Sequence, residues 1–283
     1  MTVAEALREA AGRLEAVSDM ARLDAELLMA HSLGITRSDL LLRHMDGEAP
    51  EGFEALAERR LRHEPVAYIV GHQEFYGREF LVTSDVLIPR ADSETVVEAA
   101  LAACPDPRRV LDCGVGSGAL LLTALAECEG AEGIGIDRST GTLGVAAANA
   151  ERLGLALYAQ MLCRDWRAPN WAADLGKFDL ILANPPYVED RADLPPSVRE
   201  YEPAEALFAG PEGLDDYRVL VPQLPDLLAE GGIACLEIGA VQAEAVAGIA
   251  EAAGFSVEIA RDLGDRPRAA ILRLGLGKGR END

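Results

Sequence analysis

Apolar residues recur every three or four positions through the first sixty residues, which is the spacing of short helices that each bury one face. The pattern predicts four helices, over about 3–17, 20–30, 38–45 and 53–61. Gly34 is the expected C-cap of the second helix, Ser38 is the expected N-cap of the third, and Pro65 lies beyond the fourth. The first part of the chain is therefore predicted to be a small helical bundle.

Residues 65–90 change to β-forming side chains, beginning with Val66, Tyr68 and Val70, and glycines interrupt them at 71 and 77. We expect a β-hairpin, or a pair of strands, that links the bundle to the rest of the chain. We accordingly expect a helical domain over 1–64, a hairpin linker over 65–90, a second domain over 91–276 and a disordered tail over 277–283.

From about residue 91 onward, buried apolar runs alternate with helical patterns. The predicted strands lie at 108–114, 133–137, within 156–166, at 178–186, 231–239, 255–264 and 268–275. This alternation predicts an open, mostly parallel seven-stranded sheet covered by helices on both faces, an α/β fold of the Rossmann-like type. The last two strands are joined too tightly for a crossover helix, so we expect the last strand to be antiparallel.

Composition narrows the possible classes of protein. Hydrophobic residues make up 49% of the 283 residues, which favours a globular chain, and no apolar run reaches the roughly 20 residues of a membrane span. The N-terminus lacks a signal-peptide pattern. The five cysteines are widely spaced and the four histidines form no local cluster, so we expect no disulfide framework and no metal site. These features favour a reducing cytoplasm.

Charge argues against a nucleic-acid partner. The chain has 26 basic and 48 acidic residues, a formal net charge of −22, whereas nucleic-acid binders usually present a basic face. Arg59, Arg60 and Arg62 form one small basic cluster, which we interpret as a solvated helix face.

A glycine-rich turn follows the first strand of the sheet, as Asp112-Cys113-Gly114-Val115-Gly116-Ser117-Gly118-Ala119. Glycines there let the backbone approach a ligand and turn into the helix, and Gly114, Gly116 and Ala119 match the nucleotide-binding pattern G-x-G-x-x-G/A. Asp137 ends the second strand and could accept hydrogen bonds from a ribose diol; the alternative is a helix-capping acid, a role that Thr140 could fill instead. Together they predict a nucleoside ligand without choosing between a nicotinamide dinucleotide and S-adenosylmethionine.

The fourth strand favours S-adenosylmethionine. It ends in Asn184-Pro185-Pro186-Tyr187, and the topology places this end opposite the glycine-rich turn. The side-chain carbonyl of Asn184 and the backbone carbonyl of Pro185 could accept the two hydrogens of a planar NH2 group, which Tyr187 would cover. Pro185 and Pro186 hold the segment rigid, so that the NH2 lone pair is aimed at a methyl donor, and such positioning supplies up to ~7–11 kcal/mol.

Asp165 and Trp166 close the third strand, where the carboxylate and the indole could hold an adenine. The alternative is a partly buried tryptophan in an ordinary loop. Glu237, at the end of the fifth strand, has no role that the sequence assigns.

These motifs resemble those of the HemK-type (HemK/PrmC) protein-(glutamine N5) methyltransferases, which modify peptide chain release factors. The linker EPVAYIVGHQEFYGREFLV, the turn DCGVGSGA, N-P-P-Y and YEPAEALFAGPEGLDDYR occur in family order over nearly the whole chain. The resemblance implies a class I S-adenosylmethionine-dependent fold. It places cofactor contacts at Gly114, Val115, Gly116, Ser117, Gly118, Asp137, Trp166 and Asn184, and substrate contacts at Asn184, Pro185, Pro186 and Tyr187. From the residues themselves we also expect Asp165 in the cofactor site, and Asn184, Pro185 and Tyr187 as the catalytic residues.

The resemblance also implies a partner, namely class I release factors, whose Gly-Gly-Gln glutamine would be methylated after recognition by the N-terminal domain. We expect a monomer that contacts neither nucleic acid nor membranes. N-P-P-Y is shared with N6-adenine methyltransferases of DNA or RNA, which are the main alternative. A binding protein with a decayed site, or a nicotinamide-dependent dehydrogenase, explains the intact motifs less well.

Overall fold

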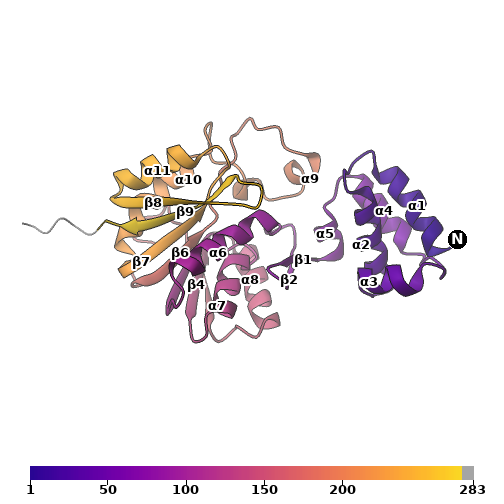
Figure 1. The fold of residues 1–283 in the computed structure, drawn as a ribbon, viewed down its shortest axis with the longest axis horizontal. Helices are drawn as coiled ribbons and strands as arrows, with labels where there is room; N and C mark the ends of the chain where they lie inside the picture. Colours follow the sequence, from indigo (N-terminus) through magenta and orange to yellow (C-terminus); the bar gives the residue numbers. More distant parts are fainter. Residues whose placement is uncertain (276–283) are drawn as a thin grey trace, which may run out of the picture. The chain divides into compact units, whose positions relative to one another are not determined.

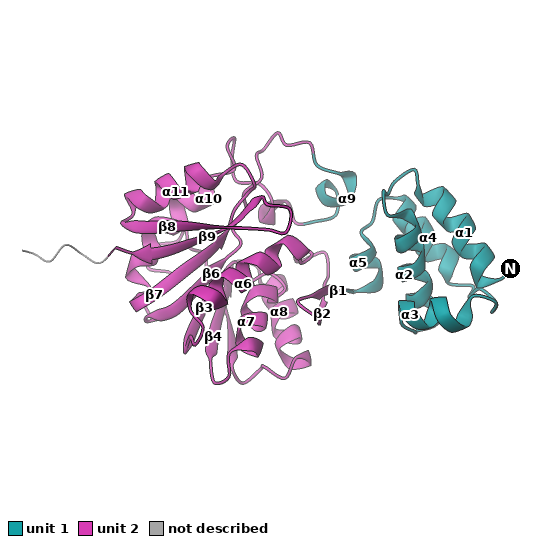
Figure 2. Ribbon diagram, in the orientation of Figure 1, with its two compact units in different colours: residues 1–72, 194–202 teal, residues 73–193, 203–283 magenta. Residues whose placement is uncertain are grey.

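The computed structural model describes residues 1–275, so the predicted disordered tail at 277–283 lies outside the described residues. The chain forms two compact units (Figure 2). The first comprises residues 1–72 together with 194–202, and the second comprises 73–193 and the chain from 203 onward. The segment 194–202 therefore packs with the N-terminal helices although it lies far from them in the sequence.

The first unit is the predicted helical bundle. Its helices are α1 (Val3–Leu14), α2 (Ala21–Leu33), α3 (Arg37–Asp39) with the π-helix Leu40–His44, α4 (Phe53–Leu61) and α5 (Val66–Val70). Gly34 adopts a left-handed conformation at φ 67° and caps α2, as predicted. The predicted N-cap Ser38 is wrong, because the hydroxyl of Thr36 accepts the backbone N–H of Asp39 instead.

Residues 66–70 are helical rather than β-stranded, which corrects the prediction for this part of the linker. The carbonyl of Pro65 accepts hydrogen bonds from the backbone N–H groups of Tyr68 and Ile69, and Gly71 ends the turn at φ 84°. Ile69 is buried in the core of the bundle. Burial in a helical neighbourhood therefore outweighs the β-propensity of this short apolar run.

The basic cluster of this unit is not a uniformly solvated face. Arg60 is buried and donates to the Asp24 carboxylate at 2.8 Å, so it belongs to the interior of the bundle. Tyr201, in the segment 194–202 that includes α9 (Pro196–Arg199), donates its hydroxyl to the Arg62 carbonyl at 2.6 Å. One side chain of the cluster is thus paired inside the bundle, and the backbone carbonyl of another binds the segment 194–202.

A two-stranded sheet, β1 (His72–Phe75) and β2 (Arg78–Leu81), forms the hairpin predicted for the linker. Its turn is Tyr76-Gly77, both with positive φ, which suits a two-residue hairpin connection. The buried side chain of Asn149 binds both the N–H and the carbonyl of Leu81, at 2.7 and 3.0 Å, and also donates to the Ser117 carbonyl at 2.8 Å. One amide therefore ties the hairpin to the glycine-rich turn.

The second unit contains the predicted seven-stranded sheet (Figure 1). Its strands are β3 (Arg109–Cys113), β4 (Glu132–Asp137), β5 (Ala159–Cys163), β6 (Phe178–Ala183), β7 (Leu228–Glu237), β8 (Phe255–Arg261) and β9 (Pro267–Leu274), in the order β5-β4-β3-β6-β7-β9-β8. Adjacent pairs from β5 to β7 are parallel, and β9 is antiparallel to both of its neighbours, as predicted.

Helices cover both faces of this sheet. One core lies under α6 (Glu94–Ala103), α7 (Ala119–Glu127) and α8 (Thr140–Arg152), and the other under α10 (Asp215–Leu220), the 3-10 turn Val221–Asp226 and α11 (Ala243–Ala252) (Figure 1). The strand order reverses between β3 and β6, because the chain adds β4 and β5 on one side before returning to the other. Ligands bind at such a switch point in open α/β sheets.

The glycines of this unit differ in the space around them, which gives a stability prediction. A Cβ at Gly135, within β4, would lie 2.6 Å from Val115 Cγ2 and 2.9 Å from Met161 Sδ, whereas one at Gly144, on the exposed side of α8, meets nothing within 4 Å. Gly135→Ala should lower the free energy of unfolding by about 1–3 kcal/mol through overpacking. The control Gly144→Ala should be neutral or raise it by up to about 1 kcal/mol. Urea unfolding measures both, and equal effects would contradict this packing.

Candidate active site

A cavity of about 230 Å³ opens at the carboxyl ends of β3, β4 and β6, within the second unit. Its lining brings together most of the residues that the sequence predicted for the site. Gly114, Val115, Gly116, Ser117, Asp137, Asp165, Trp166, Asn184 and Pro186 all line it, whereas Gly118, Pro185 and Tyr187 lie outside the lining. Residues 85–90, between the hairpin and α6, form another part of the wall.

The glycine-rich turn forms the floor of the cavity. Gly114, Gly116 and Gly118 have φ of 84°, 54° and 86°, a left-handed conformation that favours glycine. A Cβ at Gly114 would lie 3.3 Å from the Trp166 ring, and one at Gly118 would lie 2.8 Å from Leu122. Gly118 thus serves the entry into α7 rather than the cavity, and Gly114 lets Trp166 approach the turn.

Asp112 is a functional candidate to which the sequence assigned no role. It is 1% exposed, lines the cavity, and neither of its carboxylate oxygens has a hydrogen-bond partner among residues 1–275. Burial raises the pKa of Asp112 to about 7; the nearby Leu121 backbone N–H, which forms no hydrogen bond of good geometry with it, partly opposes the shift, and the charge of Asp137 adds to it. Because an unpartnered buried carboxylate is costly, this position suits a ligand that brings donors or positive charge.

Asp137 ends β4 on the cavity wall. Its Oδ1 accepts the backbone N–H of Ser139 at 3.0 Å, and burial raises the pKa of this carboxyl. The N-cap of α8 is Ser139, whose hydroxyl accepts the backbone N–H of Thr142 at 3.2 Å. The cap is therefore neither Asp137 nor Thr140, which removes the alternative role that the sequence left open for Asp137.

Trp166 is held at the cavity by a residue that the sequence did not nominate. Its Nε1 donates to Asp216 Oδ1 at 3.2 Å, and Arg167 donates to the same oxygen at 2.8 Å. Asp216 is buried at the start of α10 and also lines the cavity. Asp165, which precedes Trp166 in the sequence, accepts the Arg167 backbone N–H at 2.8 Å. Only the fold brings Asp216 to Trp166, since 50 residues separate them.

The Asn184-Pro185-Pro186-Tyr187 segment leaves the sheet beside the glycine-rich turn, because Ala183 pairs with Cys113 across β6 and β3. Asn184 and Pro186 face the cavity. The Tyr187 hydroxyl donates to Glu237 Oε1 at 3.0 Å, so its ring is fixed at the far end. Beyond it, the backbone N–H of Val188 donates to the Leu207 carbonyl at 2.8 Å, which closes the base of the long 188–214 connection.

Residues 1–275 contain no group of three or more histidine, cysteine or acidic side chains arranged to hold a metal ion. No helix of the described chain is both long enough and apolar enough to cross a membrane.

The fold is that of a methyltransferase domain. Residues 110–201 match the family model described as a methyltransferase domain. The fold is similar to that of a methyltransferase from Pyrococcus furiosus, with a TM-score of 0.52 at 16% identity over 76% of this chain and 95% of the other.

The particular family follows from the N-terminal unit and from the relatives. Residues 5–71 match the model described as the PrmC N-terminal domain. The release factor glutamine methyltransferase of Cereibacter sphaeroides is 44% identical over 97% of this chain and 99% of its own length. That of Rhodospirillum rubrum is 42% identical, over 89% and 78%. The chain belongs to the release factor glutamine methyltransferase family, as its motifs indicated.

The isolated Asp112 carboxyl gives a prediction on pH. Its folded pKa of about 7 lies above its ordinary value of 3.8, so the folded protein binds this proton more tightly than the unfolded chain. Without ligand, the wild type should therefore lose stability relative to Asp112→Asn as the pH rises from about 4 to about 7, by up to about 4 kcal/mol. Urea unfolding of both proteins across this range measures the difference. A difference that does not change with pH would contradict the assignment.

Proposed function

We propose that this protein transfers a methyl group from S-adenosyl-L-methionine to the side-chain amide nitrogen (N5) of the glutamine in the Gly-Gly-Gln motif of class I peptide chain release factors. The observation that carries the proposal is the placement of Asn184 on the same cavity as the glycine-rich turn and Asp137. The names of the relatives, release factor glutamine methyltransferases, supply the substrate.

The cavity residues fit this cofactor. S-adenosylmethionine supplies an electrophilic methyl group on a positively charged sulfur. We assign the ribose to Asp137, the adenine to Asp165 and Trp166, and a cationic part of the cofactor to the unpartnered carboxylate of Asp112. The same carboxylate disfavours a nicotinamide dinucleotide, since the pyrophosphate that binds at such a turn would meet a buried negative charge.

The substrate amide would be held at the end of β6. The Asn184 side-chain carbonyl and the Pro185 backbone carbonyl would accept its two hydrogens, Pro186 would fix the turn, and the Tyr187 ring would cover its plane. This arrangement directs the weakly nucleophilic nitrogen toward the methyl group, and positioning of this kind supplies up to ~7–11 kcal/mol. The proton becomes acidic only as the methyl group arrives, so no base needs to act first.

We assign recognition of the release factor to the helical domain, residues 1–64, with 65–90 as its linker and 91–276 as the catalytic domain. The protein would act as a monomer in the cytoplasm without contacting nucleic acid. The net charge of −22 supports a protein partner over a DNA or RNA adenine, because a nucleic-acid methyltransferase must track phosphates.

Mass spectrometry of unmethylated release factor tests the activity. After incubation with this protein and S-adenosylmethionine, the Gly-Gly-Gln glutamine should gain one methyl group. Asn184→Ala should lower the rate by at least about 100-fold, because misplacement of the reacting groups by about 1 Å has that cost. The control Gln160→Ala removes an exposed amide from β5 and should leave the rate unchanged. No methyl gain with the wild type, despite cofactor binding, would overturn the proposal.

Calorimetric titration of the cofactor tests the ribose site separately. Asp137→Asn weakens charge-assisted hydrogen bonds of about 1.5–3 kcal/mol, so the affinity for S-adenosylmethionine should fall about 10- to 100-fold. Asp226→Asn is the matched control, since Asp226 is exposed just before β7, at the opposite edge of the sheet. Equal affinities of Asp137→Asn and the wild type would remove Asp137 from the cofactor site.

A further inference from the structure

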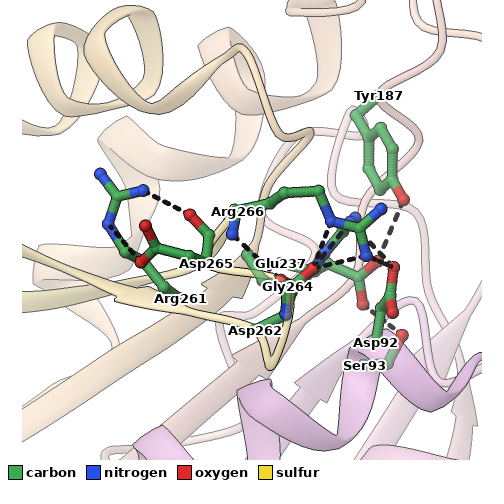
Figure 3. A network of polar contacts seen from close by, with 10 residues as sticks. Asp92, Ser93, Tyr187, Glu237, Arg261, Asp262, Gly264, Asp265 and Arg266 are labelled. Carbon is green, nitrogen blue, oxygen red and sulfur yellow. Dashed lines mark hydrogen bonds and ion pairs between the residues drawn. The ribbon is translucent and has the colours of Figure 1, made fainter.

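Glu237, which had no role in the sequence, lies fully inside the protein at the carboxyl end of β7. It is 1% exposed, and each of its carboxylate oxygens accepts a hydrogen bond from a hydroxyl. Oε2 accepts from Ser93, and Oε1 accepts from Tyr187 at 3.0 Å. Figure 3 shows the Tyr187 hydroxyl directed at this carboxylate. Glu237 therefore contacts the last residue of N-P-P-Y, and neither residue belongs to the cavity lining.

Burying the Glu237 carboxylate has a large desolvation cost. Burial raises the pKa of Glu237, and the hydrogen bonds from Ser93 and Tyr187 and the charge of Arg268 oppose the shift. An apolar side chain of similar volume would avoid the desolvation cost. The contact that such a side chain could not provide is an acceptor for the hydroxyls of Tyr187 and Ser93.

Tyr187 is held at its backbone as well as at its hydroxyl. The side-chain amide of Gln242, just before α11, donates to the Tyr187 carbonyl at 3.0 Å and to the Gly213 carbonyl at 3.2 Å. Gly213 packs so closely on the Tyr187 carbonyl that a Cβ there would collide with it. With the main chain fixed, the remaining freedom of Tyr187 is rotation of its side chain, which the hydroxyl contact removes.

The other partner of Glu237 is itself anchored. Ser93 belongs to the 3-10 turn Ala91–Ser93, and the preceding Asp92 accepts from Arg268 at 2.9 Å and from Arg266 at 3.2 Å. Arg266 lies just before β9, and Arg268 lies near the start of this strand. Arg266 also binds Asp262, which follows β8 (Figure 3). Ser93 and Glu237 are therefore part of a fixed framework that continues to the edge of the sheet.

We propose that Glu237 is a positioning residue for methyl transfer, which acts by holding the Tyr187 hydroxyl and thereby the plane of the ring that covers the substrate amide. This inference rests on the proposed function. It also assigns a state to Tyr187: the phenol is neutral, with its hydrogen directed at Glu237. Burial, followed by the charge of Glu237, raises the pKa of Tyr187, which keeps the phenol protonated.

The first test compares single variants by kcat and KM for the release factor. Tyr187→Phe and Glu237→Leu should each lower kcat by about tenfold or more, within the ~100-fold that a misplaced group costs, and change KM less than twofold. Glu237→Gln should remain within about threefold of wild type, because its amide oxygen accepts from Tyr187 and its amide nitrogen donates to Ser93. Glu230→Gln, on the exposed start of β7, is the matched control and should have no effect.

The second test asks whether the two residues act through one contact. In the double variant Tyr187→Phe/Glu237→Leu, kcat should be no lower than in the worse single variant. Multiplied losses would show that Glu237 acts independently of Tyr187 and would overturn the proposal. So would a Glu237→Gln variant as impaired as Glu237→Leu, or a Tyr187→Phe variant with normal kcat.

The same set of variants distinguishes a folding defect, a failure of the proposed function and a failure of the role proposed for Glu237. Cofactor affinity by calorimetry should be unchanged in all variants, and near-ultraviolet circular dichroism reports intact packing. If Glu237→Leu does not fold, Tyr187→Phe and Glu237→Gln decide the matter from the two sides of the hydrogen bond. A wild type that fails to methylate the release factor refutes the proposed function, whereas a normal wild type with normal Tyr187→Phe refutes only the role of Glu237.

Discussion

The pairing of β3 with β6 is the constraint on which the site depends. These strands are separated by about 70 residues, yet their parallel register sets Cys113 beside Ala183. The next residues along each strand are Gly114 and Asn184, so the glycine-rich turn and the N-P-P-Y segment leave the sheet side by side. The register of this sheet is fixed because a shift of one residue would exchange the side chains packed in the two cores, Val110 and Leu180 on one face and Leu111 and Ile181 on the other. The relative positions of the two segments that line the cavity are therefore set by the sheet.

Buried polar side chains fix the segments that leave the sheet near the cavity. Asn149 joins the hairpin to the glycine-rich turn, Gln242 holds the carbonyl of Tyr187, and Glu237 holds its hydroxyl. Each is buried with its hydrogen-bonding groups engaged, which is the condition under which polar side chains stabilise one arrangement. Asp112 departs from this rule, since its oxygens have no partner among the described residues. The departure lies on the cavity wall, where a ligand can supply what the protein does not.

The sequence was most informative where local chemistry is restrictive. Glycine suits positive φ better than other residues, so the turn after β3 and the cap at Gly34 could be predicted. The paired prolines after β6 likewise predicted a rigid segment, because proline fixes φ. The mostly parallel direction of the strands followed from their alternation with helices, and the antiparallel last strand followed from its short connection. The prediction failed at Val66–Val70, where a β-forming run folds as a helix because the bundle buries Ile69.

What the sequence by itself determined is most of the helices and strands, the chemistry of their ends and the family. What only the tertiary structure decided is which distant groups meet. Tyr187 and Glu237 are 50 residues apart, and Ser93 and Glu237 are 144 apart, so no local pattern connects them. The burial of Arg60 against Asp24, and of Asp112 without a partner, depends likewise on what surrounds each side chain. Propensity and periodicity act over a few residues, whereas desolvation and hydrogen bonding depend on neighbours that only folding supplies.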